Sequence, residues 1–185
     1  MVTFPTNYEV VWNPYLPPDG TWRQPVYAFD ERGACESPDG LVRPRETIRV
    51  EPAGGDPWIG LLPNGAKGFI SGCFPTPHPD RLLAVSEGLA LLIDVTAPQQ
   101  GAFAWRGSLV SQTFRLADPQ LLLLISFHDI LALGIDGVFW ESGELSGDGL
   151  GVFAADASMI RLSAWIHGKD CEIEVDTLTG ALVPA

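Results

Sequence analysis

The sequence predicts an all-β fold of antiparallel hairpins, and three observations support this prediction. Apolar tracts of strand length recur after residue 80, each divided by a short polar break. The aspartates that close these tracts, Asp94, Asp136 and Asp176, lie 42 and 40 residues apart. Of the 16 prolines, 13 lie in residues 1–80, where they favour turns and short edge strands. We therefore expect a Pro-rich amino-terminal arm followed by three hairpin repeats of about 40 residues.

The three hairpins are expected over residues 82–95, 122–137 and 160–180. Their turns are expected at the polar breaks Glu87-Gly88, His128-Asp129 and Gly168-Lys169-Asp170. The last copy has the clearest alternation, in which Cys171, Ile173 and Val175 are separated by Glu172, Glu174 and Asp176. Because successive side chains of a strand point to opposite faces, this pattern indicates a strand with one buried and one solvated side.

The amino-terminal part is expected to hold only short elements. Strands are predicted at 26–29 and 47–50, and further strands between the repeats at 103–106 and 138–141. Turns or loops are predicted at Pro18-Asp19-Gly20, Pro38-Asp39-Gly40 and Pro63-Asn64-Gly65. We expect a single domain over 1–185, with a soft internal boundary at the alternate prolines of residues 75–79.

Two segments resemble the sequences of propeller-type repeats. Residues 131–140 and 174–180 look like an inner strand, an Asp-containing turn and an outer strand of such a repeat. More broadly, residues 70–180 resemble an uncharacterised family of small bacterial β-proteins. The resemblance implies a β-repeat fold and no activity. Because three or four units scarcely close a ring of the typical four to eight blades, both a partial propeller and an open sandwich stay as expectations.

The chain is acidic, with a formal net charge of −12, and the excess of acidic over basic residues is concentrated in one part of the sequence. Between Asp129 and Asp176 there are ten acidic and two basic residues. No cluster of Lys and Arg is present to neutralise phosphates, so we expect no nucleic-acid partner.

No membrane partner is expected either, because the most apolar tract, residues 121–135, is short of a bilayer span. The beginning of the sequence has no secretory signal pattern. Three widely spaced cysteines, Cys35, Cys73 and Cys171, fit reduced thiols better than a disulfide framework, so a cytoplasmic location is expected.

Patterns of catalytic and metal-binding residues are weak. His128-Asp129, with Ser126 nearby, is interpreted as a hairpin tip and not as part of a triad, because neighbours on a strand diverge. The pairs His167/Cys171 and Cys73/His78 lack zinc-site spacing, and no Gly-rich phosphate loop or calcium ladder occurs. We therefore expect no cofactor, no metal and no catalytic residues, and an enzyme is the less favoured class.

The candidate binding residues are acids that accompany aromatics in the last two repeats. They are Trp140, Glu141, Glu144, Asp148, Asp170, Glu172 and Glu174. Paired carboxylates beside an aromatic also suit glycoside hydrolysis, but such pairs arise readily in so acidic a chain.

Two functions are expected from this pattern. The preferred one is a non-enzymatic recognition protein of the inhibitor or immunity type that binds a basic protein partner. The alternative is a carbohydrate-binding or carbohydrate-active protein that stacks sugars on Trp12, Trp22, Trp140 or Trp165.

Overall fold

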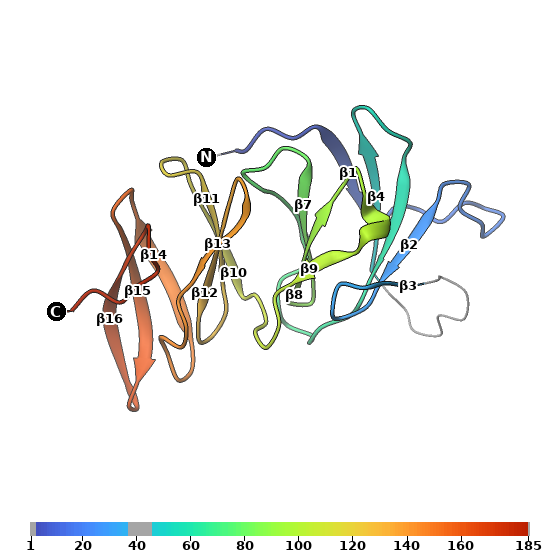
Figure 1. Ribbon diagram of the computed structural model, residues 1–185. Helices are drawn as coiled ribbons and strands as arrows, with labels where there is room; N and C mark the ends of the chain where they lie inside the picture. The colour runs from blue at the N-terminus through green and yellow to red at the C-terminus, as the bar shows by residue number, and fades with distance from the viewer. Residues whose placement is uncertain (1–2, 37–45, 185) are drawn as a thin grey trace. The chain divides into compact units, whose positions relative to one another are not determined.

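The chain folds as an all-β protein, as the sequence predicts. The structure is a computed structural model that describes residues 3–36 and 46–184. Within these residues it holds sixteen β-strands, one turn of 3-10 helix and no α-helix. The strands form four separate small sheets, which we call A to D (Figure 1). No helix in the described part of the chain has the length and apolar character needed to cross a membrane.

The four sheets belong to two compact units. The first unit comprises Pro5–Pro75 and Pro79–Gly107, and the second is built from Ser108 onward together with short stretches such as Thr76–His78. The first predicted hairpin lies in the first unit with the amino-terminal strands, whereas the other two hairpins lie in the second. The expectation of a single domain stays a prediction.

The first unit consists of sheets A and B. Sheet A has the order β1-β4-β5-β2-β3, and its strands are β1 (Tyr8–Trp12), β2 (Val26–Phe29), β3 (Cys35–Glu36), β4 (Glu46–Pro52) and β5 (Trp58–Leu62). Its neighbours are antiparallel except β2 and β5, which run parallel. Sheet B is a meander of β6 (Gly72–Pro75), β7 (Arg81–Ser86), β8 (Leu89–Asp94) and β9 (Ala102–Ala104), with the 3-10 turn η1 (Pro98–Gln100) before β9.

Sheets A and B share one apolar core. Ile48 and Trp58 of sheet A pack in the same cluster as Leu82, Leu91 and Ile93 of sheet B. Most residues of β7 and β8 are buried in succession, and such strands appear in the sequence as continuous apolar runs. The unit is therefore a two-layer sandwich.

The second unit repeats this two-sheet plan with sheets C and D. Sheet C is a meander of β10 (Gln112–Leu116), β11 (Leu121–Ile125), β12 (Ile130–Gly134) and β13 (Gly137–Glu141). Sheet D has three strands, β14 (Leu150–Ala155), β15 (Met159–Ile166) and β16 (Lys169–Asp176). Leu123, Ile130 and Trp140 of sheet C share a core cluster with Ile160 and Leu162 of sheet D.

The three predicted hairpins are confirmed as β7–β8, β11–β12 and β15–β16. The third turn lies earlier than expected, at His167-Gly168, where both residues have positive φ of 49° and 78°. Such a two-residue turn matches the right-handed twist of the flanking strands. Lys169 and Asp170 consequently belong to β16 and not to the turn.

The repeated aspartates are not all equivalent. Asp94 and Asp176 end the second strand of their hairpins, and each accepts backbone hydrogen bonds from the turn that follows, from Thr96 at 2.9 Å and from Thr179 at 2.8 Å. Asp136 instead lies in the tight turn between β12 and β13. The interval near 40 residues is a property of the hairpins, whereas the structural role of the aspartate recurs only in the first and third.

The amino-terminal part is irregular between β1 and β2, as its prolines predict. The predicted strands correspond to β2 and β4, and the Gly20 N–H donates to the Pro17 carbonyl at 2.8 Å in the predicted turn. The turn predicted at Pro38-Asp39-Gly40 lies outside the described residues.

Candidate functional site

Sheet D has one buried and one solvated side. Along β15 the buried Ile160, Leu162 and Ala164 alternate with exposed residues. The register pairs Arg161 with Glu174, Ser163 with Glu172 and Trp165 with Asp170 across β15 and β16. We call the solvated side the acidic face and define it as Phe153, Arg161, Ser163, Trp165, Asp170, Glu172 and Glu174.

Only one cation belongs to this face. The Arg161 guanidinium pairs with the Glu174 carboxylate, with 3.1 Å between Nε and Oε1, and both side chains are about half exposed. Exposed pairs of this kind contribute little to stability. Asp170 and Glu172 are exposed and lie opposite the uncharged Trp165 and Ser163, so their negative charge is not neutralised across the strand pair.

Apolar side chains accompany these acids. Phe153 occupies the bulge where the register of β14 shifts between Val152 and Ala154, and it is 55% exposed. Trp165 is 40% exposed and Leu182 is 54% exposed. A groove of about 400 Å³ is lined by residues of the acidic face, by Ile173 of β16 and by the carboxyl-terminal segment, namely Phe153, Arg161, Glu172, Ile173, Glu174, Leu182, Val183 and Pro184. Sequence patterning missed Phe153 and Leu182, because a bulge and a lone bridge have no periodic signal.

Asp148 lies beside the same face. The N–H of Gly147 donates to the Trp165 carbonyl at 2.9 Å, and the N–H of Trp165 donates to the Gly149 carbonyl at 3.3 Å. The buried hydroxyl of Ser146 accepts a further bond from the Trp165 N–H at 2.9 Å. These bonds fix the loop that carries Asp148 next to the end of β15.

The remaining predicted residues have different surroundings. Trp140 is buried, and its indole Nε1 donates to the Thr177 carbonyl at 2.9 Å. Glu141 ends β13 and Glu144 lies in the loop after it, and both are exposed. The structure therefore brings Asp148, Asp170, Glu172 and Glu174 around sheet D, and it places Trp140 in the core of the second unit.

Ser126, His128 and Asp129 form the turn of the β11–β12 hairpin. The Ser126 hydroxyl donates to Asp129 and accepts from the backbone N–H groups of His128 and Asp129, each at 2.9 Å. Ser108 also donates to Asp129, at 2.8 Å. The His128 ring has its Nδ1 3.0 Å from the Ser146 carbonyl, so the imidazole contacts backbone and not the Ser126 hydroxyl. This geometry is that of a closed turn.

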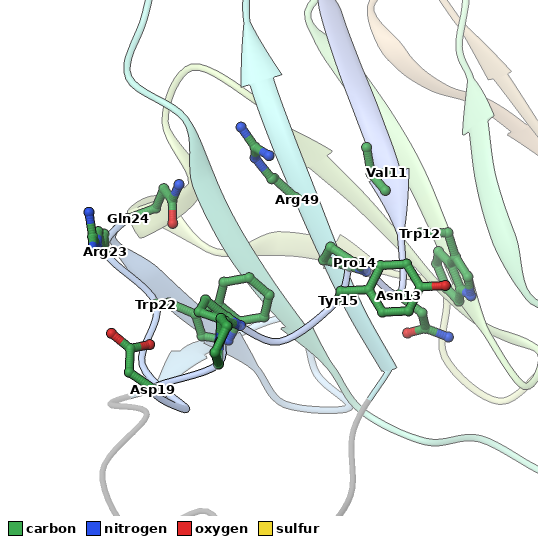
Figure 2. Close-up of a pocket in the computed structure, with 12 residues that line it drawn as sticks. Val11, Trp12, Asn13, Pro14, Tyr15, Asp19, Trp22, Arg23, Gln24 and Arg49 are labelled. Atoms are coloured by element: carbon green, nitrogen blue, oxygen red, sulfur yellow. The ribbon is translucent and has the colours of Figure 1, made fainter.

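A second candidate site is an aromatic pocket of about 1000 Å³ in the first unit. Figure 2 shows Asn13, Pro14 and Tyr15 at the end of β1, Trp22 to Gln24 on the returning stretch, and Arg49 extending from β4. Its lining residues include Trp12, Tyr15, Trp22, Arg23, Gln24 and Arg49. Tyr15 is fully exposed, whereas Trp12 and Trp22 are half-buried. The pocket is open to solvent and offers aromatic rings for stacking together with polar groups for hydrogen bonding.

Arg49 has a local partner in this pocket. Its Nη2 lies 2.9 Å from Glu51 Oε1 on the same strand. β4 lies between β1 and β5 and is interior to sheet A, so this ion pair does not lie on an edge strand. Arg43 and Arg45, which precede Arg49 in the sequence, lie outside the described residues.

The thiols and acids show few features of a metal or redox site. All three cysteines are free thiols. Burial, and next the negative charge of Glu46, raise the pKa of the Cys73 thiol from 9.0 to about 12, which suppresses its reactive thiolate. Among the described residues there is no group of three His, Cys, Asp or Glu side chains that could hold a metal ion.

Two acids of sheet D have lowered pKa values for local reasons. The backbone and hydroxyl of Ser158 donate to Asp156, and the hydroxyl and backbone of Thr179 donate to Asp176; these bonds lower the pKa of each carboxyl. Both residues stabilise turns and are distinct from the acidic face.

Comparison with known proteins identifies no relative: neither a family model, nor a curated protein, nor a solved structure matches the chain.

Proposed function

We propose that this protein is a non-enzymatic recognition protein of the inhibitor or immunity type, and that its acidic face binds a basic protein partner. The observation that carries the proposal is the arrangement of β15 and β16, where the exposed Asp170 lies opposite Trp165 and the exposed Glu172 lies opposite Ser163. Protein interfaces combine an aromatic-rich core with a polar rim, and the exposed Trp165 beside carboxylates is compatible with this arrangement.

The charge contributes mainly to encounter and specificity. Complementary potentials steer association and reject partners of like charge, and their effect declines as salt screens them. Trp165 and Phe153 supply the apolar contact area that holds the complex once it has formed. Arg161 is already paired with Glu174, so it opposes a basic partner only weakly.

The proposal is tested by isothermal titration against a panel of purified small basic proteins. The triple variant Asp170→Asn, Glu172→Gln, Glu174→Gln removes the three acids of the acidic face and keeps Asp176, which stabilises the turn after β16. The matched control Glu9→Gln, Glu31→Gln, Asp56→Asn changes the net charge equally at exposed positions of the first unit. We expect the first triple variant to weaken binding at least ~10-fold and the control to weaken it less than ~3-fold at moderate salt. Equal effects of the two, or no binding by any basic protein, would refute the proposal.

The aromatic pocket supports a second candidate function, the binding of a carbohydrate. A sugar ring can stack on Tyr15 or Trp22 while Arg23 and Gln24 bind its hydroxyls. Trp140 is buried and takes no part in this candidate. A glycan array tests it: Trp22→Ala should abolish any signal and Trp165→Ala should leave it unchanged. A blank array for the wild-type protein would remove this candidate.

We place the protein in the cytoplasm. Three free thiols on separate strands fit a reducing compartment. Mass spectrometry of protein isolated under acid quench should show all three as thiols, and a native disulfide would contradict this location.

A further inference from the structure

Sheet D lacks a fourth strand that the comparable sheets possess. In sheets B and C the fourth strands, β9 and β13, pair antiparallel with the third strands, β8 and β12. The third strand of sheet D is β16, and among the described residues its outer edge meets only the carboxyl-terminal segment, through the bridge of Val175 with Leu182. Within residues 46–184 no strand pairs with the outer edge of β16 over 169–173.

The hydrogen bonds of the carboxyl-terminal segment show which backbone groups face this edge. The Glu174 carbonyl accepts from Val183 at 2.8 Å, and the Asp176 N–H donates to Ala181 at 2.9 Å. The backbone N–H and C=O groups of successive residues point to alternate neighbours of a strand. Residues an even number of positions from 174 and 176 therefore also direct these groups outward. The N–H and C=O groups of Asp170 and Glu172 therefore point to the open edge.

β16 is the longest of the edge strands, and its open part, 169–173, matches the full five-residue length of the edge strands β1 and β10. β16 has eight residues and keeps an unbroken register with β15, whereas the edge strand β14 carries a bulge and β9 has three residues. Shortness and bulges are common protections against strand addition. β16 has neither, and its protection consists of its charges.

We propose that an extended basic segment of the partner protein adds antiparallel to β16 beside Lys169–Ile173 and completes sheet D as its fourth strand. This inference rests on the proposed function and specifies how the acidic face engages its partner. The segment alternates Lys or Arg, opposite Asp170 and Glu172, with apolar residues on the other side, next to Cys171 and Ile173. Main-chain hydrogen bonds supply the affinity of such a complex, and the alternate side chains supply its selectivity.

The charges select the occupant of the edge. Opposite charges directly across a strand pair are favourable, and like charges are unfavourable. If a second copy of this chain paired antiparallel through β16, residues on the solvated side would face one another, so acids would oppose acids in every register. A basic segment meets no such repulsion.

The groove beside β16 fits the same occupant. Phe153 and Leu182 border it together with Glu172 and Glu174. Long basic side chains can lay their apolar stems along Phe153 and Leu182 while their charged ends reach the carboxylates.

The test uses an acetylated and amidated octapeptide that alternates Lys and Val, titrated into the full chain. Its control is the same peptide N-methylated at the lysine amides, which keeps the charge and removes the donors that would face β16. We expect the parent peptide to slow hydrogen exchange at the Asp170 and Glu172 amides at least ~10-fold, and N-methylation to weaken binding at least ~10-fold.

Two variants separate charge from backbone pairing. Glu172→Gln removes the charge and should weaken binding of the peptide about twofold to fivefold. Glu172→Pro also removes the N–H that points outward and leaves the hydrogen bonds to β15 intact. It should weaken binding of the peptide ~10-fold more than Glu172→Gln does. If Glu172→Pro does not fold, the N-methylated peptide on the wild-type chain decides the same question.

The outcomes distinguish this inference from the proposed function. Basic proteins that bind through the acids of β16 without protecting the Asp170 and Glu172 amides would overturn strand addition and leave the proposed function in place. Equal binding of parent and N-methylated peptides would overturn it too. A dimer of this chain that is lost in Glu172→Pro would show that the edge serves a second copy instead. If no basic ligand binds at all, both proposals fail and the acids serve only as protection of an edge.

Discussion

Trp140 donates its indole N–H to the carbonyl of Thr177 at 2.9 Å, and Trp58 donates to the carbonyl of Val95 at 3.0 Å in the same way. In each case a tryptophan of the first sheet of a unit reaches the residue that follows the closing aspartate of the second sheet, 37 positions along the chain. Each unit thus has an indole-to-carbonyl hydrogen bond that joins its two sheets, and each has two layers.

Loss of either indole donor should destabilise the protein by a similar amount. Trp140→Phe and Trp58→Phe keep most of the ring but leave a buried carbonyl without its donor. We expect each to lower the free energy of unfolding by about 1–3 kcal/mol. Urea denaturation checks this, with Trp165→Phe as the exposed control, expected to change stability by less than ~0.5 kcal/mol. A control as costly as the two buried variants would contradict the assignment.

Gly180 should tolerate no side chain, because it packs against Trp140. A Cβ there would lie 2.5 Å from Trp140 Cε3, and its φ is +70°. Gly143 has the same φ of +70° with open space around it, so Gly143→Ala measures the backbone strain alone. We expect Gly180→Ala to cost about 1–3 kcal/mol more than Gly143→Ala, which is the usual range for overpacking. If urea denaturation gives the two variants equal losses of unfolding free energy, the Trp140 ring moves aside without energetic cost and the prediction is wrong.

Much of the fold could be predicted from local patterns, and the missing part is non-local. The three hairpins follow from paired apolar runs around short polar breaks. The parallel pairing of β2 with β5 crosses from Val26 to Ile59 and leaves no local signal, because strand order is decided by packing.

The candidate site was predictable to a similar extent. Alternation places Glu172 and Glu174 on the solvated side of β16, yet it does not tell an exposed tryptophan from a buried one. Trp140 and Trp165 both lie on strands, and only the packing of sheet C against sheet D buries the former. Of the aromatic pocket the sequence predicts only Trp12 and Trp22, as candidate stacking residues, because the proline-rich stretch after Trp12 has no periodic pattern.

Cys73 should be the least reactive thiol in the native protein. Burial raises the pKa of Cys73 to about 12 and raises the pKa of Cys35 as well, though without so large a shift. Since only the thiolate attacks, alkylation of Cys73 by iodoacetamide at pH 8 should be at least ~100-fold slower than that of an ordinary cysteine. Peptide mapping by mass spectrometry checks this, and labelling in urea should equalise the three sites. Native labelling of Cys73 as fast as Cys35 would be inconsistent with its burial.

Stability should decline at alkaline pH because of the same thiol. The pKa of Cys73 is raised in the folded state from 9.0 to about 12, so the unfolded chain releases this proton first. The stabilisation is complete below pH 9 and is lost as the pH rises toward 12. Burial also raises the pKa of Tyr8, which adds to the loss at higher pH.

The variant Cys73→Ala removes the titrating thiol and should flatten this decline. Between pH 8 and 11 the wild type should lose about 2 kcal/mol more stability than the variant. Glu46→Gln should act in the same direction but less, because the Glu46 charge is the smaller of the two causes that raise the pKa of Cys73. Urea denaturation at stepped pH measures all three proteins. Parallel curves for wild type and Cys73→Ala would place the alkaline transition on other groups.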